Sequence, residues 1–337
     1  MFAEDDPGGL RRGRFLYFPA VPGRLEFAEE LRRILLTERP GVVAVELPAT
    51  LEPAYGRAIE RLPQLSVIIY PEEAEADRAV YIPVEVTDPF VEALRTAAEI
   101  GAQAAFVDPD AGERPHLEED YPDTYAVRRI GLESYVQAYR FHRRKPAAGA
   151  RAFARGIAWK LQGLDPEARV LVVVSLNLLD AVMEAMEHPQ AQPMRRLKKR
   201  AAQTLNLDPG CLAEVLTEFP FLQAAYESAR GGEEPLDRQR LQFRLFAEAE
   251  RRYEANVGEK LAGWQRRLWG RYTRNLALSQ KQLVAGLFDL IVAARSVVDE
   301  NFAWDLWEAA NVYPHQKTAT DLMTVRISGE EMWLRTK

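Results

Sequence analysis

Residues 16–48 read LYFPAVPGRLEFAEELRRILLTERPGVVAVELP, and this one stretch contains a strand, a helix and a second strand. The first apolar run ends in the turn residues Pro19–Gly23, and the second run ends at Glu46. Between them, apolar residues recur with the spacing of one helical face over residues 24–38. Two strands joined by one helix predict a parallel pair with a right-handed crossover.

The same alternation continues to about residue 188. Strands are predicted at 14–20, 42–47, 65–70, 79–85, 103–108 and 169–175. Helices are predicted at 24–38, 51–62, 89–101, 131–141, 147–163 and 176–187. Residues 109–127 are rich in proline, glycine and acids, and predict a loop near the sheet edge. Residues 1–188 are therefore predicted to form an α/β domain, with a mostly parallel sheet and helices on both faces.

Residues 189–337 are predicted to form a helical domain, because the strand signal ends there. Pro189–Gln192 resembles a linker. Helices are predicted at 193–205, 209–230, 235–255, 256–276, 278–299 and 301–311. Thr324–Lys337 alternates like a short strand or hairpin. We expect that this last segment continues into a longer protein or pairs with a partner.

The composition favours a cytoplasmic protein. The chain of 337 residues has a net charge of −6 and a single cysteine, Cys211, so an intramolecular disulfide is impossible. The acidic N-terminal segment lacks the apolar region of a signal peptide, and no apolar run has the length of a membrane span.

Polar residues follow several predicted strands where each strand ends. Glu46 and Asp108 are candidate catalytic carboxylates, and Ser175 and Asn177 are candidate ligand-binding residues, since ligands of parallel α/β sheets bind outside the carboxyl ends of the strands. Each has a structural alternative. Glu46 pairs with an arginine or caps a helix, Asp108 forms an Asx-type turn, and Ser175 or Asn177 caps the following helix.

Three further residues are candidates for ligand binding at the same edge. Gly23 and Arg24 follow the first strand, and Arg155 lies on the predicted helix 147–163. One of the helix's basic residues, Arg151, Arg155 or Lys160, is expected to neutralise Glu46 or an anionic ligand, with a solvated surface position as the alternative.

Motifs for metal and nucleotide chemistry are missing. None of the four histidines, His116, His142, His188 and His315, forms a metal-binding spacing with another. The sequence has no G-x-S-x-G elbow, no Walker A motif and no G-x-G-x-x-G motif. We therefore predict no cofactor, and a divalent metal has no support from histidine spacing.

Three basic stretches, one of them rich in aromatic residues, are the basis of an alternative prediction of nucleic-acid binding. Two runs, 142–145 and 195–200, are strongly basic, and residues 264–274 mix tryptophan and tyrosine with arginine as single-strand binders do. The alternative is an ordinary amphipathic bundle helix, because Trp264, Leu268 and Tyr272 share one helical face.

Three segments together resemble the superfamily that includes TraB, Tiki, the erythromycin esterases and the haem-binding ChaN proteins. They are residues 16–48, residues 93–110 (ALRTAAEIGAQAAFVDPD) and residues 150–182 (ARAFARGIAWKLQGLDPEARVLVVVSLNLLDAV). Glu46 matches the glutamate that ends the family's second strand, and Asp108 matches a later aspartate. The resemblance covers roughly residues 14–187 and implies the family's α/β fold.

The resemblance also implies which family residues this chain lacks. The family's first-turn histidine is absent from Pro19–Gly23, and Ser175–Asn177 replaces its late-strand histidine. In active relatives these histidines bind metal or transfer protons, so a metallopeptidase or esterase mechanism here lacks its general base.

The leading interpretation is a catalytically degenerate α/β domain that acts as a binding, regulatory or assembly module. The resemblance implies a protein partner such as an AAA+ ATPase or a von Willebrand A-type protein. One alternative is a hydrolase that uses Glu46 and Asp108. A second alternative is nucleic-acid binding through the helical half.

Overall fold

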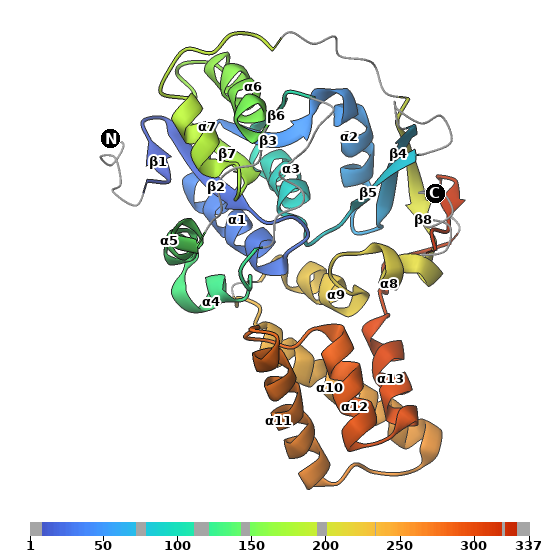
Figure 1. Ribbon diagram of the computed structural model, residues 1–337. Coiled ribbons are helices and arrows are strands. Elements are labelled where there is room, and N and C mark those ends of the chain that lie inside the picture. Colours follow the sequence, from blue (N-terminus) through green and yellow to red (C-terminus); the bar gives the residue numbers. More distant parts are fainter. Residues whose placement is uncertain are drawn as a thin grey trace.

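The computed structural model shows a mixed α/β protein with two sheets, flanking helices and a separate group of long helices (Figure 1). It describes residues 9–71, 79–110, 121–142, 149–193, 201–232, 234–318 and 321–328. Among the helices of these ranges, none combines the length and apolarity that crossing a bilayer requires.

Sheet A has five strands in the order β1-β2-β7-β3-β6. They are β1 (Arg11–Arg12), β2 (Phe15–Ala20), β7 (Val170–Ser175), β3 (Val42–Pro48) and β6 (Gln103–Asp108). The last four pair in parallel, whereas β1 pairs antiparallel with β2 at one edge. The carboxyl ends of the four parallel strands, which we call the strand-end rim, therefore lie on one side.

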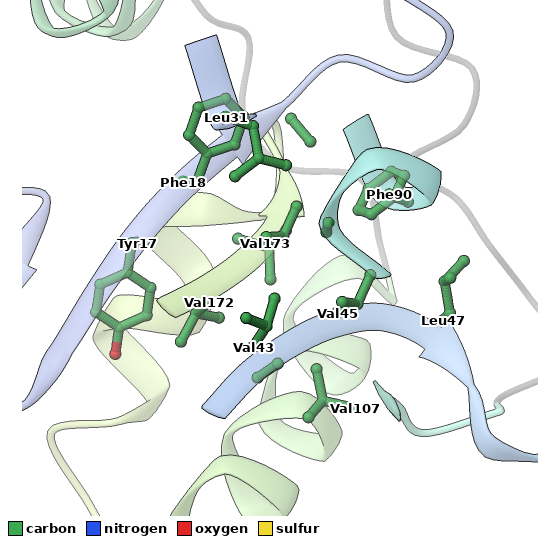
Figure 2. Close-up of a cluster of buried hydrophobic side chains, with 14 of the residues drawn as sticks. Tyr17, Phe18, Leu31, Val43, Val45, Leu47, Phe90, Val107, Val172 and Val173 are labelled. Carbon is green, nitrogen blue, oxygen red and sulfur yellow. The ribbon is translucent and has the colours of Figure 1, made fainter. Parts of the chain in front are cut away.

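Helices cover both faces of sheet A. They are α1 (Leu25–Glu38) and α3 (Pro89–Ile100), which pack together, and α6 (Ala150–Gln162) and α7 (Leu179–Ala185), which also pack together. Figure 2 shows Val45 and Val173 directed toward Leu31 of α1 and Phe90 of α3, whereas Val172 is directed to the other side. The strands are apolar on both sides because both faces are buried.

The expectation of one mostly parallel sheet is not confirmed, since sheet A is mixed and a second sheet exists. Sheet B has the order β5-β4-β8-β9, formed by β5 (Ala79–Val84), β4 (Ser66–Pro71), β8 (Gln203–Leu207) and β9 (Thr324–Val325). The predicted strands 65–70 and 79–85 pair antiparallel with each other. The reason is the short connection 72–78, because a parallel crossover needs a dozen or more residues.

The second half of the chain was expected to be helical, but it also contains the strands β8 and β9. Its helices are α8 (Leu212–Val215), α9 (Pro220–Ala229), α10 (Arg238–Val257), α11 (Gly263–Ser279), α12 (Leu287–Val297) and α13 (Glu300–Ala310). The helix predicted at 193–205 is wrong at its end, where β8 pairs antiparallel with β4, and residues 194–200 lie outside the described ranges. The domain boundary at residue 188 stays a prediction.

Three helices of the first half complete the fold: α2 (Glu52–Glu60), α4 (Ala126–Ile130) and α5 (Leu132–His142). Residues 111–120 of the predicted loop 109–127 lie outside the described ranges. So do residues 329–337 of the predicted terminal strand or hairpin. Thr324 and Val325 form the short strand β9.

Helices α10 to α13 form a bundle with its own aromatic core. The ring of Phe246 lies 4.4 Å from that of Trp269 and 5.1 Å from that of Phe302, measured between ring centroids. The indole Nε1 of Trp269 donates to the carbonyl of Leu290 at 3.3 Å, so the one polar atom of this buried side chain has a partner.

A buried ionic cluster joins the bundle to the α/β part. Arg238, the first residue of α10, binds the carboxylates of Glu26 on α1 and Glu218 just before α9. Both carboxylates are at most 4 % exposed. Burial raises the pKa of Glu26, but the Arg238 guanidinium outweighs it and holds that pKa below its ordinary value.

We predict that Arg238→Met lowers the free energy of unfolding by about 3–5 kcal/mol, because it leaves two buried carboxylates without a counter-ion. Urea denaturation measures the change. Arg251→Met is the matched control, since Arg251 is exposed beside Glu248 and its loss should change stability far less than the loss of Arg238. Adding Glu26→Gln and Glu218→Gln to Arg238→Met should restore part of the loss. Equal stabilities of the Arg238 and Arg251 variants would contradict the assignment.

Candidate functional site

Glu46 lies at the strand-end rim but is directed at the protein's own backbone. Its side chain is 5 % exposed, and its Oε2 accepts the backbone N–H of Ser175 at 2.7 Å. The register of β3 against β6 shifts between Val45 and Pro48. Such irregularities redirect side chains at strand ends. Here the carboxylate of Glu46 on β3 forms a hydrogen bond to the end of β7.

Asp108 is fully buried at the end of β6. Its Oδ1 accepts the backbone N–H of Asp110 at 2.6 Å, which is the Asx-type turn that was the structural alternative. Asp110 in turn accepts the Thr50 hydroxyl at 2.7 Å. The predicted catalytic carboxylates therefore both make hydrogen bonds that stabilise the rim itself.

The basic residue at the rim is Lys160, and Arg155 is exposed to solvent, as is Arg151. Lys160 Nζ donates to the carbonyls of Phe106 at 3.2 Å and Asp108 at 2.7 Å. Burial lowers the pKa of Lys160, and the nearby aspartate charges oppose that shift. Arg155 therefore takes the solvated surface position that was its structural alternative, and its ligand-binding role stays a prediction. Helical spacing separates Lys160 from Arg155. Lys160 lies on the same side of α6 as the buried Phe153, Ile157 and Leu161, whereas Arg155 lies on the opposite side.

Gly23 and Arg24 contact other segments of the chain. Gly23 has φ +66°, and its N–H donates to Oδ2 of Asp88 at 2.9 Å. A Cβ at Gly23 would lie 2.6 Å from Thr217, so this approach requires glycine. Arg24 Nη1 lies 3.9 Å from Oε1 of Glu218. Both residues thus belong to the junction between α1, α3 and the segment before α9.

Ser175 and Asn177 do not cap the helix that follows them. The residue before α7 is Leu178, and no side chain caps this helix. Ser175 is buried and contributes its backbone N–H to Glu46, while Asn177 is partly buried in the turn. Of the candidate residues, the structure therefore brings Glu46 and Ser175 into direct contact.

Two neighbouring carboxylates that were not predicted, the buried Glu85 and the half-buried Asp88, lie at the same junction as Gly23. Glu85 accepts the backbone N–H and the hydroxyl of Thr217 at 3.0 and 2.9 Å, and the amide of Gln223. Burial raises the pKa of Glu85 to about 7, the charge of Asp88 adds to the rise, and the hydrogen bonds oppose it. The alternation Val84-Glu85-Val86 was the available signal, since it places a carboxylate beside buried valines.

No group of three or more histidine, cysteine or acidic side chains suited to a metal ion occurs within the described ranges. His116 lies outside them. The carboxylates of Glu46, Asp108 and Glu85 instead act as hydrogen-bond acceptors for the protein's own donors.

Helix α11 exposes the side that was expected to face the bundle. Trp264, Leu268 and Tyr272 are 56 %, 41 % and 37 % exposed. The buried side consists of Trp269, Thr273 and Ala277. The interpretation of the first three residues as a bundle face is therefore wrong.

Arginines lie beside these exposed aromatic residues. The arginine–aromatic face, as we call it, consists of Trp264, Arg267, Leu268, Arg271, Tyr272 and Arg274, all exposed. The other basic runs singled out in the sequence lie largely outside the described residues, at 143–145 and 195–200.

A groove of about 480 Å³ opens beside this face, between α4, α10 and α11. Arg274 of α11 and Arg129 of α4 line it together with the exposed ring of Phe243. Arg129 also lies 5.5 Å from the centre of the Tyr125 ring and donates to Gln239. The groove therefore combines cationic, aromatic and amide groups.

Comparison of the chain with protein-family models, with curated proteins and with solved structures found no match.

We predict that Glu46→Ala lowers the free energy of unfolding by about 1–3 kcal/mol, because the buried N–H of Ser175 loses its acceptor. Glu46→Gln retains an acceptor oxygen and should cost less. Glu60→Ala, which removes an exposed glutamate at the end of α2, is the control and should change stability by at most about 0.5 kcal/mol. Thermal and urea unfolding measure all three. A Glu46→Ala protein as stable as the control would show that this hydrogen bond is dispensable.

We also predict that Glu85 makes the protein less stable as the pH rises from about 5 to about 7. The folded state keeps the proton up to about pH 7, whereas the unfolded state releases it near the ordinary pKa of 4.5, so the unfolded state binds fewer protons in this window. The contribution is about 3 kcal/mol. Urea unfolding at several pH values should show this loss in the wild type and a smaller one in Glu85→Gln, which cannot ionise. An unchanged pH dependence in Glu85→Gln would refute the prediction, and Glu60→Gln serves as the exposed control.

Proposed function

We propose that this protein is a binding and assembly module whose α/β part is catalytically degenerate. One observation carries the proposal: the carboxylate of Glu46 accepts the backbone N–H of Ser175 and is 5 % exposed. A catalytic carboxylate must reach a substrate or an activated water, and this one is engaged inside the protein.

The rest of the rim supports the same proposal. Asp108 is buried in its own turn, and Lys160 binds backbone carbonyls of β6. The positions where the TraB and erythromycin-esterase group carries histidines hold none in this chain. We further propose that residues 14–187 are a divergent member of that group, and the parallel order β2-β7-β3-β6 agrees with its α/β architecture.

The proposal includes a cytoplasmic location and a protein partner. The single cysteine, Cys211, is buried and free, which suits a reducing compartment. By the family resemblance alone, the partner is an AAA+ ATPase or a von Willebrand A-type protein. Nucleic-acid binding is a second candidate function, favoured by the exposed arginines and aromatic rings of α11.

The competing proposal is a hydrolase that uses Glu46 and Asp108. If it were correct, Glu46→Gln would abolish turnover while leaving the melting temperature nearly unchanged. We expect the reverse: neither wild type nor Glu46→Gln hydrolyses model esters or peptides, with or without added Zn²⁺ or Mn²⁺, and the substitution affects only stability. Turnover by the wild type that disappears in Glu46→Gln would refute the proposed function.

A further inference from the structure

The sequence of α11 and its flanking turns has one sign of charge. Residues 260–288 contain lysines and arginines but no aspartate or glutamate. Arg266 pairs with Glu250 of α10, whereas Arg267, Arg271 and Arg274 have no carboxylate partner among the described residues. These three guanidinium groups therefore retain their full charge toward solvent, and an anionic partner complements them.

The geometry of the helix arranges the exposed residues in two adjacent rows. Arg267, Arg271 and Arg274 are separated by four and three residues, so they follow one line along the helix. Trp264, Leu268 and Tyr272 are four residues apart and form the neighbouring line. The arginine row rises about 10 Å, which is about three nucleotides at ~3.4 Å each.

We infer that the arginine–aromatic face of α11 binds single-stranded nucleic acid. The phosphates of the nucleic acid lie along the arginine row, and its bases stack on Trp264 and Tyr272. Base stacking on aromatic rings beside a cationic track is the general mode of sequence-tolerant single-strand binding. The inference rests on the proposed function, because it names the ligand of a module that binds without catalysis.

The groove extends this surface at one end. Arg274 belongs to both, and across the groove Arg129 supplies a further cation. Acidic residues near the groove are engaged by internal donors: Asp123 accepts the N–H groups of Tyr125 and Leu283, and Asp237 accepts the Tyr125 hydroxyl. The single-stranded nucleic acid therefore continues from the arginine row into the groove. There the ring of Phe243 is 61 % exposed and available for stacking.

The distribution of charge favours nucleic acid over a membrane. Arg271 is two residues from both Trp269 and Thr273, which are buried, so it lies at the centre of the solvent-facing side. A helix that lies in a membrane places apolar residues there and basic residues at the margins. The flat exposed rings likewise favour bases over the side chains of an acidic polypeptide.

The test uses fluorescence anisotropy with a labelled oligothymidylate of about 12 nucleotides, a length within the known range of single-strand sites. We expect wild-type affinity to fall at least about 20-fold between about 50 and 200 mM salt, as phosphate contacts from the three arginines of the row require. In Arg267→Gln/Arg271→Gln the slope of log affinity against log salt should shrink by about 0.7 for each arginine. Trp264→Ala should weaken binding at least about fivefold at every salt concentration.

The matched control is Arg251→Gln/Arg295→Gln, which removes two exposed arginines of the neighbouring helices α10 and α12. Each of them already has a carboxylate partner, Glu248 and Glu300. This variant should bind the oligonucleotide like the wild type. Equal loss in the control and in the α11 variant would overturn the site, since net charge alone would then account for binding.

Two further probes separate the alternatives. Polyglutamate and vesicles of anionic lipid are titrated under the same conditions. Binding to either one without binding to the oligonucleotide would overturn the inference but leave a binding module in place. Cleavage of the oligonucleotide that Glu46→Gln abolishes would instead contradict the proposed function, so the two failures are distinguishable.

Discussion

The arrangement of the whole molecule depends on the buried contact of Arg238 with Glu26 and Glu218. Arg238 begins α10, and the other bundle helices follow it in the chain. Glu26 lies in the first turn of α1, which crosses from β2 to β3. Burying these charges has a large desolvation cost, so their geometry specifies orientation more than it adds stability. The bundle therefore packs at one angle against α9, and α11 lies at the outer side of the bundle (Figure 1).

Local periodicity was sufficient to predict most elements, because apolar spacing determines them. The strand-helix-strand pattern of 16–48 corresponds to β2, α1 and β3, with each end within one residue of the prediction. Strand pairing was harder to predict. Strand β8 carries polar residues at several positions, and its partner β4 lies far away in the sequence, so no local signal distinguished it from a helix end.

At the rim, the sequence predicted where the carboxylates lie but not what they contact. The position of Glu46 at a strand end followed from the valine run, yet its direction depends on the register shift that follows Val45. On α11 two helical faces carry aromatic residues, and periodicity alone could not rank them. Trp269 occupies the core because its ring packs on Phe246 and its Nε1 reaches the carbonyl of Leu290.

The arginines of this protein fall into two kinds, and the difference bears on function. Arg230 and Arg95 pair with the buried or partly buried carboxylates of Glu92 and Glu227, so folding accounts for them. The arginine row of α11 has no such partner among the described residues. Arginines four apart repel each other and cost an isolated helix about 0.2–0.5 kcal/mol. The contacts of the described residues do not account for this row, and the polyanion that we infer as its ligand would offset the repulsion.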